Sequence, residues 1–303
     1  MNSGVRNAML WFQASRPFSF TASITPVLIA AAWAWRSEFP VRWILFPLFL
    51  LCALLLHAAT NLISDYVDYT KGVDREDTFG SSGVLVRNQL KPEAVRAGAY
   101  GVYGAALVIG LVIVSYRGWG LFVLGLLGMA GGFFYTVSPV GYKYHALGDI
   151  GVFLFMGVLL VAGAFWALTG VLPVSTILVS VPVSFLVAAI LFANNVRDIK
   201  HDQDAGVRTL AGRLGFRRAK KLYYALLGAP YAAVLVLVAT RIVSPWALAV
   251  FFSLPKALRN CADMRGGIEG KPETVATLDV QSAQLHLVFG LLFAAALAWG
   301  GPG

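Results

Sequence analysis

The chain is a succession of long apolar runs, and each run approaches the length that a bilayer demands. A helix needs roughly 20 mostly apolar residues to cross the hydrocarbon core. The eighth run is the shortest, because Pro245 and Pro255 bracket it, so a count of eight also fits. The runs predict nine spanning helices, at about residues 18–36, 42–60, 96–116, 118–137, 147–169, 172–193, 222–240, 243–259 and 280–300.

The composition supports an all-α polytopic membrane protein. Hydrophobic residues make up 58% of the chain and charged residues only 13%, whereas soluble domains average about 25% charged residues. We expect a single membrane domain over residues 1–303. It consists of two weakly related halves, about 1–140 and 141–303, because each half carries an acidic cluster behind an apolar run.

The basic residues are distributed unevenly over the predicted loops. With the N-terminus inside, 20 of the 24 Lys and Arg residues fall on the inner side, which is the bias that orients membrane proteins. We therefore expect a multi-pass protein of a cell (cytoplasmic) membrane, with its N-terminus in the cytoplasm. The net charge of +9 lies in loops beside the lipid bilayer, so we expect anionic headgroups nearby and no nucleic-acid partner.

Two acidic clusters stand directly behind apolar runs. The first cluster follows the second predicted span and contains Asn61, Asp65, Asp68, Lys71 and Asp74. The second cluster follows the sixth predicted span and contains Asn194, Asn195, Arg197, Asp198 and Asp202. Because both spans are even-numbered, both clusters are expected on the cytoplasmic side.

The spacing of the Asp residues indicates a metal site. On a continuing helix, Asp65 and Asp68 share one face, and so do Asp198 and Asp202. Carboxylates this close repel one another unless a cation lies between them. Mg²⁺ takes one or two carboxylates, several waters and phosphate oxygens, which suits sparse Asp residues. A single Asp could equally cap a helix end, but two clusters on one side favour a metal site that uses all four carboxylates.

Basic residues near the clusters predict an anionic ligand. Lys71, Arg87, Arg197 and Arg208 could neutralise the charge of a diphosphate that the metal does not balance. The apolar spans around the clusters could hold a lipid tail while the charged head meets the metal. These features together predict a site for an amphiphilic diphosphate at the membrane face.

From about residue 13 to 295 the chain resembles the UbiA superfamily of membrane prenyltransferases. The resemblance rests on the paired Asp motifs, on Lys71-Gly72-x-Asp74 and on Gly206-x-Arg208-Thr209, which are most similar to the menaquinone branch. It implies a bundle of about nine helices around a central cavity. It also implies Mg²⁺-dependent transfer of a polyprenyl group from a polyprenyl diphosphate to an aromatic acceptor, most closely 1,4-dihydroxy-2-naphthoate.

The resemblance also implies roles for individual residues. Asp65, Asp68, Asp198 and Asp202 would hold Mg²⁺ against the diphosphate and so serve catalysis. Asp149 could position or deprotonate the acceptor, although a carboxylate at a helix N-terminus is an equally good interpretation. Tyr135 could shield an allylic cation with its ring face. The expected substrate-binding set is Asn61, Lys71, Asp74, Arg87, Tyr135, Lys143, Asp149, Asn194, Asn195, Arg197 and Arg208.

Two other hypotheses fit part of the sequence. A cation-coupled transporter also uses acidic residues inside a membrane bundle, but its sites usually lie near the midplane rather than at one face. A related enzyme could ionise the same diphosphate and then cyclise it, or transfer it to another quinone precursor, a carotenoid or a lipid. The sequence does not separate these acceptors, since their pockets are built from apolar and aromatic side chains.

Overall fold

The computed structural model describes residues 3–76 and 79–300 of the chain, and the helices in these ranges carry the whole architecture. The α-helices are α1 (Ser3–Ala14), α2 (Thr21–Trp35), α3 (Leu45–Thr70), α4 (Pro92–Arg117), α5 (Trp119–Phe133), α6 (Gly148–Val152), α7 (Leu160–Thr169), α8 (Val174–Arg197), α9 (Ile199–Asp204), α10 (Leu210–Leu214), α11 (Phe216–Ala239), α12 (Leu254–Gly266) and α13 (Leu278–Gly300). Short 3₁₀ segments are η1 (Pro17–Phe20), η2 (Tyr142–Tyr144), η4 (Pro245–Ser253) and η5 (Pro272–Val275). A π-helical segment, η3 (Phe153–Leu159), joins α6 to α7.

Seven helical segments in the described part of the chain have the length and apolarity needed to cross a membrane. They correspond to the first three, the fifth to the seventh and the ninth predicted spans. The fourth predicted span is α5, which has only 15 residues. The eighth is divided into η4 and α12, because Pro245 opens the first segment and Pro255 lies in the first turn of the second. The all-α membrane bundle is therefore confirmed, whereas the count of nine spanning helices is not.

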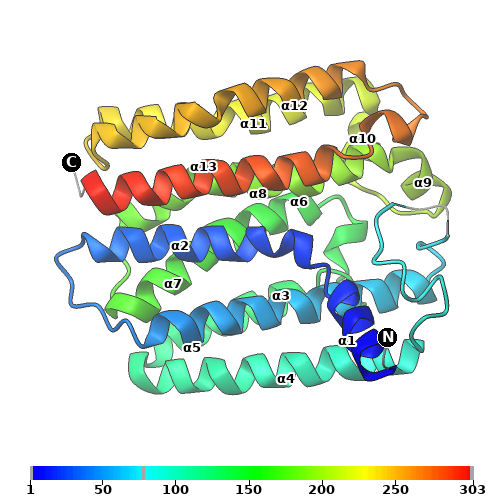
Figure 1. The fold of residues 1–303 in the computed structure, drawn as a ribbon, viewed down its shortest axis with the longest axis horizontal. Helices are drawn as coiled ribbons and strands as arrows, with labels where there is room; N and C mark the ends of the chain where they lie inside the picture. Colours follow the sequence, from blue (N-terminus) through cyan, green and yellow to red (C-terminus); the bar gives the residue numbers. More distant parts are fainter. Residues whose placement is uncertain (1–2, 77–78, 301–303) are drawn as a thin grey trace.

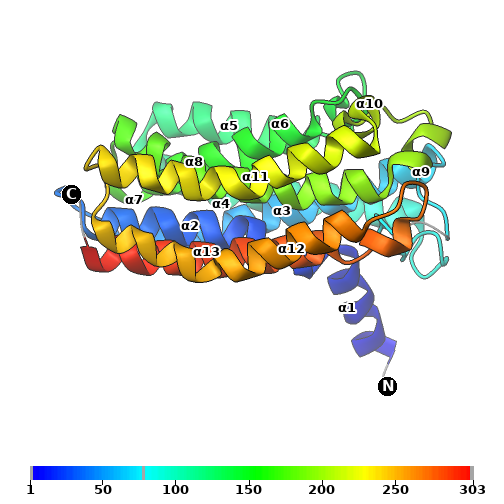
Figure 2. The same ribbon diagram turned by 90° about the horizontal axis from the view of Figure 1, so that it is seen from above.

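The long helices run side by side along the longest axis of the molecule (Figure 1). α3 packs along α4, α2 along α13, and α8 against both α11 and α13. The loop after α3, together with α9 and α10, gathers at one end of the bundle, and α13 ends at the opposite end. Figure 2 shows α1 leaving the bundle sideways at the end that carries these loops. Both acidic clusters therefore lie at the same end, as their even-numbered spans predict.

Small residues let helices approach closely in the core. Gly290 of α13 faces Thr25 of α2, and Gly157 of η3 faces Ser184 of α8, with no room for a methyl group in either place. Such small-residue contacts are a common basis of helix packing in membranes, where the hydrophobic effect does not draw helices together. They bring α13 close to α2 and η3 close to α8.

Replacing Gly290 by Ala is expected to destabilise the bundle, because the new methyl group would overlap the side chain of Thr25. Overpacking of this kind costs about 1–3 kcal/mol, so the thermal unfolding midpoint in detergent should fall. Gly228→Ala is the matched control, since no other group lies within 4 Å of its added Cβ. An equal midpoint for the two variants would contradict the close packing of α2 on α13.

Candidate active site

A large cavity opens at the end of the bundle where the two acidic clusters lie. Its volume is about 1810 Å³, counting its open side. The walls come from η1, α2, α3, α8 and α9 and from the loop residues after α3. Nine of the predicted site residues line it: Asn61, Asp68, Asp74, Tyr135, Lys143, Asn194, Asn195, Asp198 and Asp202. The fold thus brings together two sequence clusters that lie far apart in the chain.

Asp68 is the most elaborately bound carboxylate of the first cluster. Its side chain is 2% exposed, and the Nζ of Lys143 donates to its Oδ2 at 2.6 Å while the hydroxyl of Tyr144 donates to its Oδ1 at 2.6 Å. Ser64, one turn earlier, donates to the same carboxylate at 3.2 Å. Burial disfavours the ammonium form, but Asp68 beside it holds the pKa of Lys143 above its usual value. A cation therefore already balances the charge of Asp68.

Asp65 lies behind the wall of the cavity and pairs with the segment that precedes α2. Arg16 and the hydroxyl of Ser82 both donate to its carboxylate. Arg16 has a positive φ of 54°, and its carbonyl oxygen accepts from Ser19 at 2.8 Å. The amide of Asn61 donates to the carbonyl oxygen of Ser15 at 2.9 Å. These contacts hold the guanidinium of Arg16 in the wall of the cavity.

The second cluster is organised around Arg197. The guanidinium donates to both carboxylate oxygens of Asp198 at 2.9 Å, to Asp279 of α13 at 2.7 Å, and to the side chain of Asn194. Its side chain is only 3% exposed. Because Arg197 uses its donors in this way, it orients Asp198 and Asn194 at the cavity and ties α8 to α13.

Six predicted residues do not line the cavity in the described part of the chain. Asp65 and Arg197 lie behind the wall, and buried Asp149 accepts from the amide of Asn195 at 3.0 Å. Lys71 is exposed and stacks over the ring of Tyr144 at 3.8 Å. Arg87 and Arg208 are also exposed, because their loops pass over the end of the bundle. The structure therefore gives these six residues supporting or peripheral positions.

The sequence reasoning missed several residues that the fold places at this site. Arg16, Ser19, His57 and Asp279 all line the cavity. His57 is held by Ser19 at 3.1 Å and by Ser23 at 2.9 Å. The sequence contained a feature that could have indicated Arg16, because this residue directly precedes Pro17 and the first span. Asp279 had a weaker signal, as an acidic residue in the first turn of the last helix.

Two carboxyl groups of the cavity outside the spanning segments bind protons unusually tightly. Burial raises the pKa of Asp202 to about 7, and neighbouring Asp198 adds to the rise. Burial also raises the pKa of Asp74 to about 7, with a further contribution from Asp68. Nearby Lys143 offsets only part of both rises, so two carboxyls with raised pKa values share the cavity with the ion-paired Asp68.

Raising the pH from about 5.5 to about 8 is expected to lower the thermal stability of the metal-free protein. The pKa of Asp202 is about 7 in the folded protein against an ordinary 3.8. Between these values the folded state binds more protons than the unfolded state, so its stability is highest at low pH and is lost as the pH rises. One such carboxyl contributes at most about 1.4 kcal/mol per pH unit.

Unfolding midpoints measured across this pH range, without divalent metal, check the prediction. Asp202→Asn should flatten the slope, because an amide does not titrate. Asp204→Asn, an exposed position in the same helix, should keep the wild-type slope. An identical slope in Asp202→Asn and the wild type would contradict the raised pKa.

The donor set of the cavity fits a hard divalent cation. Within residues 3–76 and 79–300, no three His, Cys, Asp or Glu side chains lie close enough together to form a closed metal site. Mg²⁺ does not need one, since it keeps several waters and shares phosphate oxygens. Carboxylates of Asp68, Asp198 and Asp202 and amides of Asn61 and Asn194 face the same cavity, and these are the ligand atoms that Mg²⁺ prefers.

Away from the carboxylates the cavity becomes apolar. Leu56 of α3, Met156 of η3 and Val187 and Leu191 of α8 form its inner wall. A concave site with a few convergent polar groups and an apolar remainder suits a ligand of the same mixed character. The cavity therefore matches an amphiphile with a multiply charged head and a hydrocarbon tail.

A helical membrane bundle with this cavity at one end has clear relatives among proteins of known fold. The apo structure of a UbiA homologue from Aeropyrum pernix K1 superposes with a TM-score of 0.69 at 16% identity, covering 92% of this chain and 98% of that one. A UbiA homologue from Archaeoglobus fulgidus bound to GPP and Mg²⁺ gives a TM-score of 0.62 at 17% identity, covering 94% and 99%. The chain thus has the fold of these membrane proteins.

Sequence comparison identifies the family. Residues 23–262 match the UbiA prenyltransferase family, and the chain belongs to it and is a multi-pass membrane prenyltransferase. It is 34% identical over 290 residues to a 1,4-dihydroxy-2-naphthoate octaprenyltransferase of Bacillus subtilis (strain 168), covering 95% of this chain and 92% of that protein. It is 35% identical over 288 residues to UbiA prenyltransferase domain-containing protein 1 of Gallus gallus, covering 93% and 84%.

Proposed function

We propose that this enzyme transfers a polyprenyl group from a polyprenyl diphosphate to 1,4-dihydroxy-2-naphthoate, with Mg²⁺ as its cofactor. The observation that carries the proposal is the cavity itself, which is lined by Asp68, Asp198 and Asp202 and also by apolar side chains. The Archaeoglobus fulgidus homologues bound to GPP or DMAPP and Mg²⁺ support a donor of this kind.

The polar end of the cavity would bind the donor head. Asp68, Asp198 and Asp202 would hold Mg²⁺, with Asp65 one turn before Asp68 as a further ligand if Arg16 moves from it to the diphosphate. When bound, the metal would supply positive charge that stabilises the departing diphosphate. Lys143 and Arg16 would donate to the oxygens that the metal leaves unbalanced. Asn61 and Asn195 would orient this assembly.

The transfer would then follow from the charge at the polar end. The allylic C–O bond breaks, and its electron pair leaves with the diphosphate. The ring carbon of the acceptor supplies the pair for the new C–C bond, and loss of the ring carboxylate as CO₂ returns electrons to the ring. Tyr135, which lines the cavity beside Lys143, would present its ring face to the allylic cation.

The acceptor assignment rests on the relative from Bacillus subtilis. The buried pair of Asp149 and Asn195 would position the acceptor through the amide of Asn195, which lines the cavity. The transporter hypothesis is set aside, because the chain belongs to a prenyltransferase family. Transfer to a different acceptor and cyclisation of the donor are the two alternatives that an experiment must distinguish from transfer to 1,4-dihydroxy-2-naphthoate.

Incubation of the purified protein with Mg²⁺, octaprenyl diphosphate and 1,4-dihydroxy-2-naphthoate tests the proposal. We expect Mg²⁺-dependent diphosphate release together with a prenylated naphthoquinol, both lost in Asp65→Ala and Asp198→Ala. Diphosphate release without a prenylated naphthoquinol would contradict the proposed acceptor but would still support the proposed donor. No release with any prenyl donor would overturn the whole assignment.

We also propose that the cavity opens toward the cytoplasm. The loops at its end of the bundle carry most of the basic residues, and Lys71, Arg87 and Arg208 are exposed there, as expected for the inner side of a membrane. Arg208→Cys, in a background with Cys52 and Cys261 replaced by Ser, should react with an impermeant maleimide only after cells are opened. Labelling in intact cells would reverse the orientation.

A further inference from the structure

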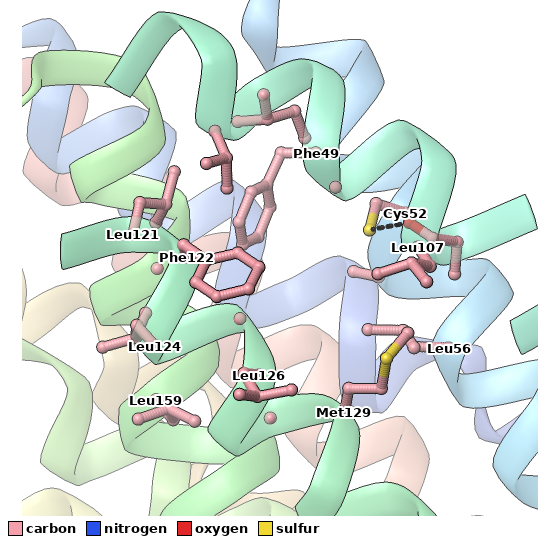
Figure 3. Close-up of a pocket in the computed structure, with 18 of the residues that line it drawn as sticks. Phe49, Cys52, Leu56, Leu107, Leu121, Phe122, Leu124, Leu126, Met129 and Leu159 are labelled. Carbon is pink, nitrogen blue, oxygen red and sulfur yellow. Dashed lines mark hydrogen bonds between the residues drawn. The ribbon is translucent and has the colours of Figure 1, made fainter. Parts of the chain in front are cut away.

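A second cavity lies between α3, α4, α5 and the η3–α7 segment, and its volume is about 850 Å³, counting its open side. We call it the side chamber. Figure 3 shows Phe49 and Leu56 of α3, Leu107 of α4, and Phe122 and Met129 of α5 around this space. Every residue that lines the side chamber is apolar, a glycine or a cysteine. The one cysteine, Cys52, already donates its thiol to the carbonyl oxygen of Ala106 at 3.3 Å.

The side chamber borders the active-site cavity. Five residues line both spaces: Ala53, Leu56, Gly128, Phe155 and Leu160. We call these five residues the threshold. Phe155 belongs to the π-helical segment η3, and Leu160 follows it directly. π-Helical turns are rare in proteins, and those that occur are often found at functional sites. This one lies where the two cavities meet.

The order of the lining residues along α3 shows how deep the side chamber reaches. Going from Asp68 toward the N-terminus of α3, the active-site cavity is lined by Ser64, Asn61, His57, Leu56 and Ala53. The side chamber begins at the last two of these residues and continues along Cys52 and Phe49. At 1.5 Å per residue, Phe49 lies roughly 28 Å along the helix from Asp68. That distance approaches the thickness of the hydrocarbon core, about 30 Å. The path thus runs from the carboxylates toward the far side of the membrane.

We propose that the side chamber binds the distal isoprene units of the donor, and that Gly128 at the threshold decides how long a donor the enzyme accepts. This inference rests on the proposed function and specifies its substrate. A long chain whose diphosphate is held at Asp68 would enter the side chamber across the threshold, which includes Gly128. Glycine keeps the passage open because it has no side chain.

The chemistry of the walls selects a hydrocarbon occupant. An aromatic acceptor carries hydroxyl and carboxylate groups, and burying these without hydrogen-bond partners costs several kcal/mol. The side chamber offers no side-chain partner beyond the thiol of Cys52. An acyl chain of a bilayer lipid would also fit the walls. The donor is favoured because the side chamber shares five lining residues with the cavity that would hold the donor head.

The substitution Gly128→Leu tests the passage without a built-in clash. A Cβ at Gly128 would meet Leu159 at 3.6 Å, which is an ordinary contact, so the larger side chain occupies the threshold. We expect kcat/KM for octaprenyl diphosphate to fall by about tenfold or more, since losing pocket contacts of this size costs about 10–200-fold. With geranyl diphosphate, whose chain ends before the threshold, we expect a change of less than about twofold.

Gly104→Leu is the matched control. Gly104 lies on the exposed face of α4, has nothing within 4 Å of its added Cβ and lines neither space. It should keep the wild-type preference between the two donors. Equal losses for both donors in Gly128→Leu, or an unchanged preference, would overturn the role of Gly128. Absence of diphosphate release from the wild type with either donor would instead overturn the proposed function.

A second measurement does not depend on turnover or on the folding of a variant. Octaprenyl diphosphate with a diazirine at its distal end is bound to the wild-type protein and photolysed, and the crosslinked peptides are mapped. We expect crosslinks within residues 106–129 that excess unlabelled octaprenyl diphosphate removes and added phospholipid does not. Crosslinks confined to other helices, or removal by phospholipid alone, would show that the distal chain lies elsewhere or that lipid fills the side chamber.

Discussion

Asp68→Asn is expected to reduce Mg²⁺-dependent diphosphate release by about 10²–10³-fold, the range typical for removing one preorganised electrostatic contact at a reacting group. The substitution keeps the shape of the side chain but removes the charge that would bind the metal. It also leaves Lys143, which donates to Asp68 at 2.6 Å, without its counterion. Lys143 would then compete for the position of the metal instead of assisting it.

Diphosphate release at saturating donor, followed with and without Mg²⁺, measures this effect. Asp204→Asn is the control, because Asp204 ends α9 as an exposed residue outside the cavity. It should retain activity within about twofold, as a surface substitution away from the site should. If Asp68→Asn keeps its thermal midpoint and near wild-type release, Asp68 is not a ligand of the donor complex.

Arg197→Gln is expected to destabilise the protein by about 3–5 kcal/mol, because breaking a buried ion pair leaves an uncompensated charge. Two carboxylates, those of Asp198 and Asp279, depend on this one guanidinium. Glutamine can donate to one of them but supplies no positive charge. The contact between α8 and the start of α13 should loosen, and Asp198 should lose its orientation toward the cavity.

Thermal or denaturant unfolding in detergent measures the loss, with Arg208→Gln as the control. Arg208 follows the same motif but is exposed, so its replacement should change the stability by less than about 0.5 kcal/mol. Equal stabilities for Arg197→Gln and the wild type would contradict the buried network. A double variant with Asp279→Asn should recover part of the loss, since it removes one of the two unpaired charges.

Three carboxylates in or beside the cavity already have basic partners in the chain. Arg16 pairs with Asp65, Lys143 with Asp68 and Arg197 with Asp198. These pairs explain how acidic residues can be buried together without a closed metal site among the described residues. Arg16 and Lys143 also line the cavity, so under the proposed function these two side chains would serve the protein before and after the donor binds.

The sequence determined the class of the protein and the end of the bundle that carries the site. Runs of apolar residues require helices, since a bilayer leaves backbone groups no other partners. The positions of the two Asp clusters behind even-numbered spans placed them on one side. The sequence singled out the eighth run, which Pro245 and Pro255 bracket. Hydropathy does not record local backbone geometry, however, and so did not predict that the run divides into η4 and α12.

The tertiary structure alone decided which residues face the cavity. Arg197 and Arg208 have the same charge and lie 11 residues apart in the sequence, yet one is buried between two carboxylates and the other is exposed. Arg16 and Asp279 come from opposite ends of the chain and line the same cavity. Sequence periodicity assigns a residue to a face of its own helix, whereas the partner of that face depends on how separate helices pack. The sequence could not predict the side chamber for the same reason. Its walls come from several helices whose apolar residues look alike in sequence.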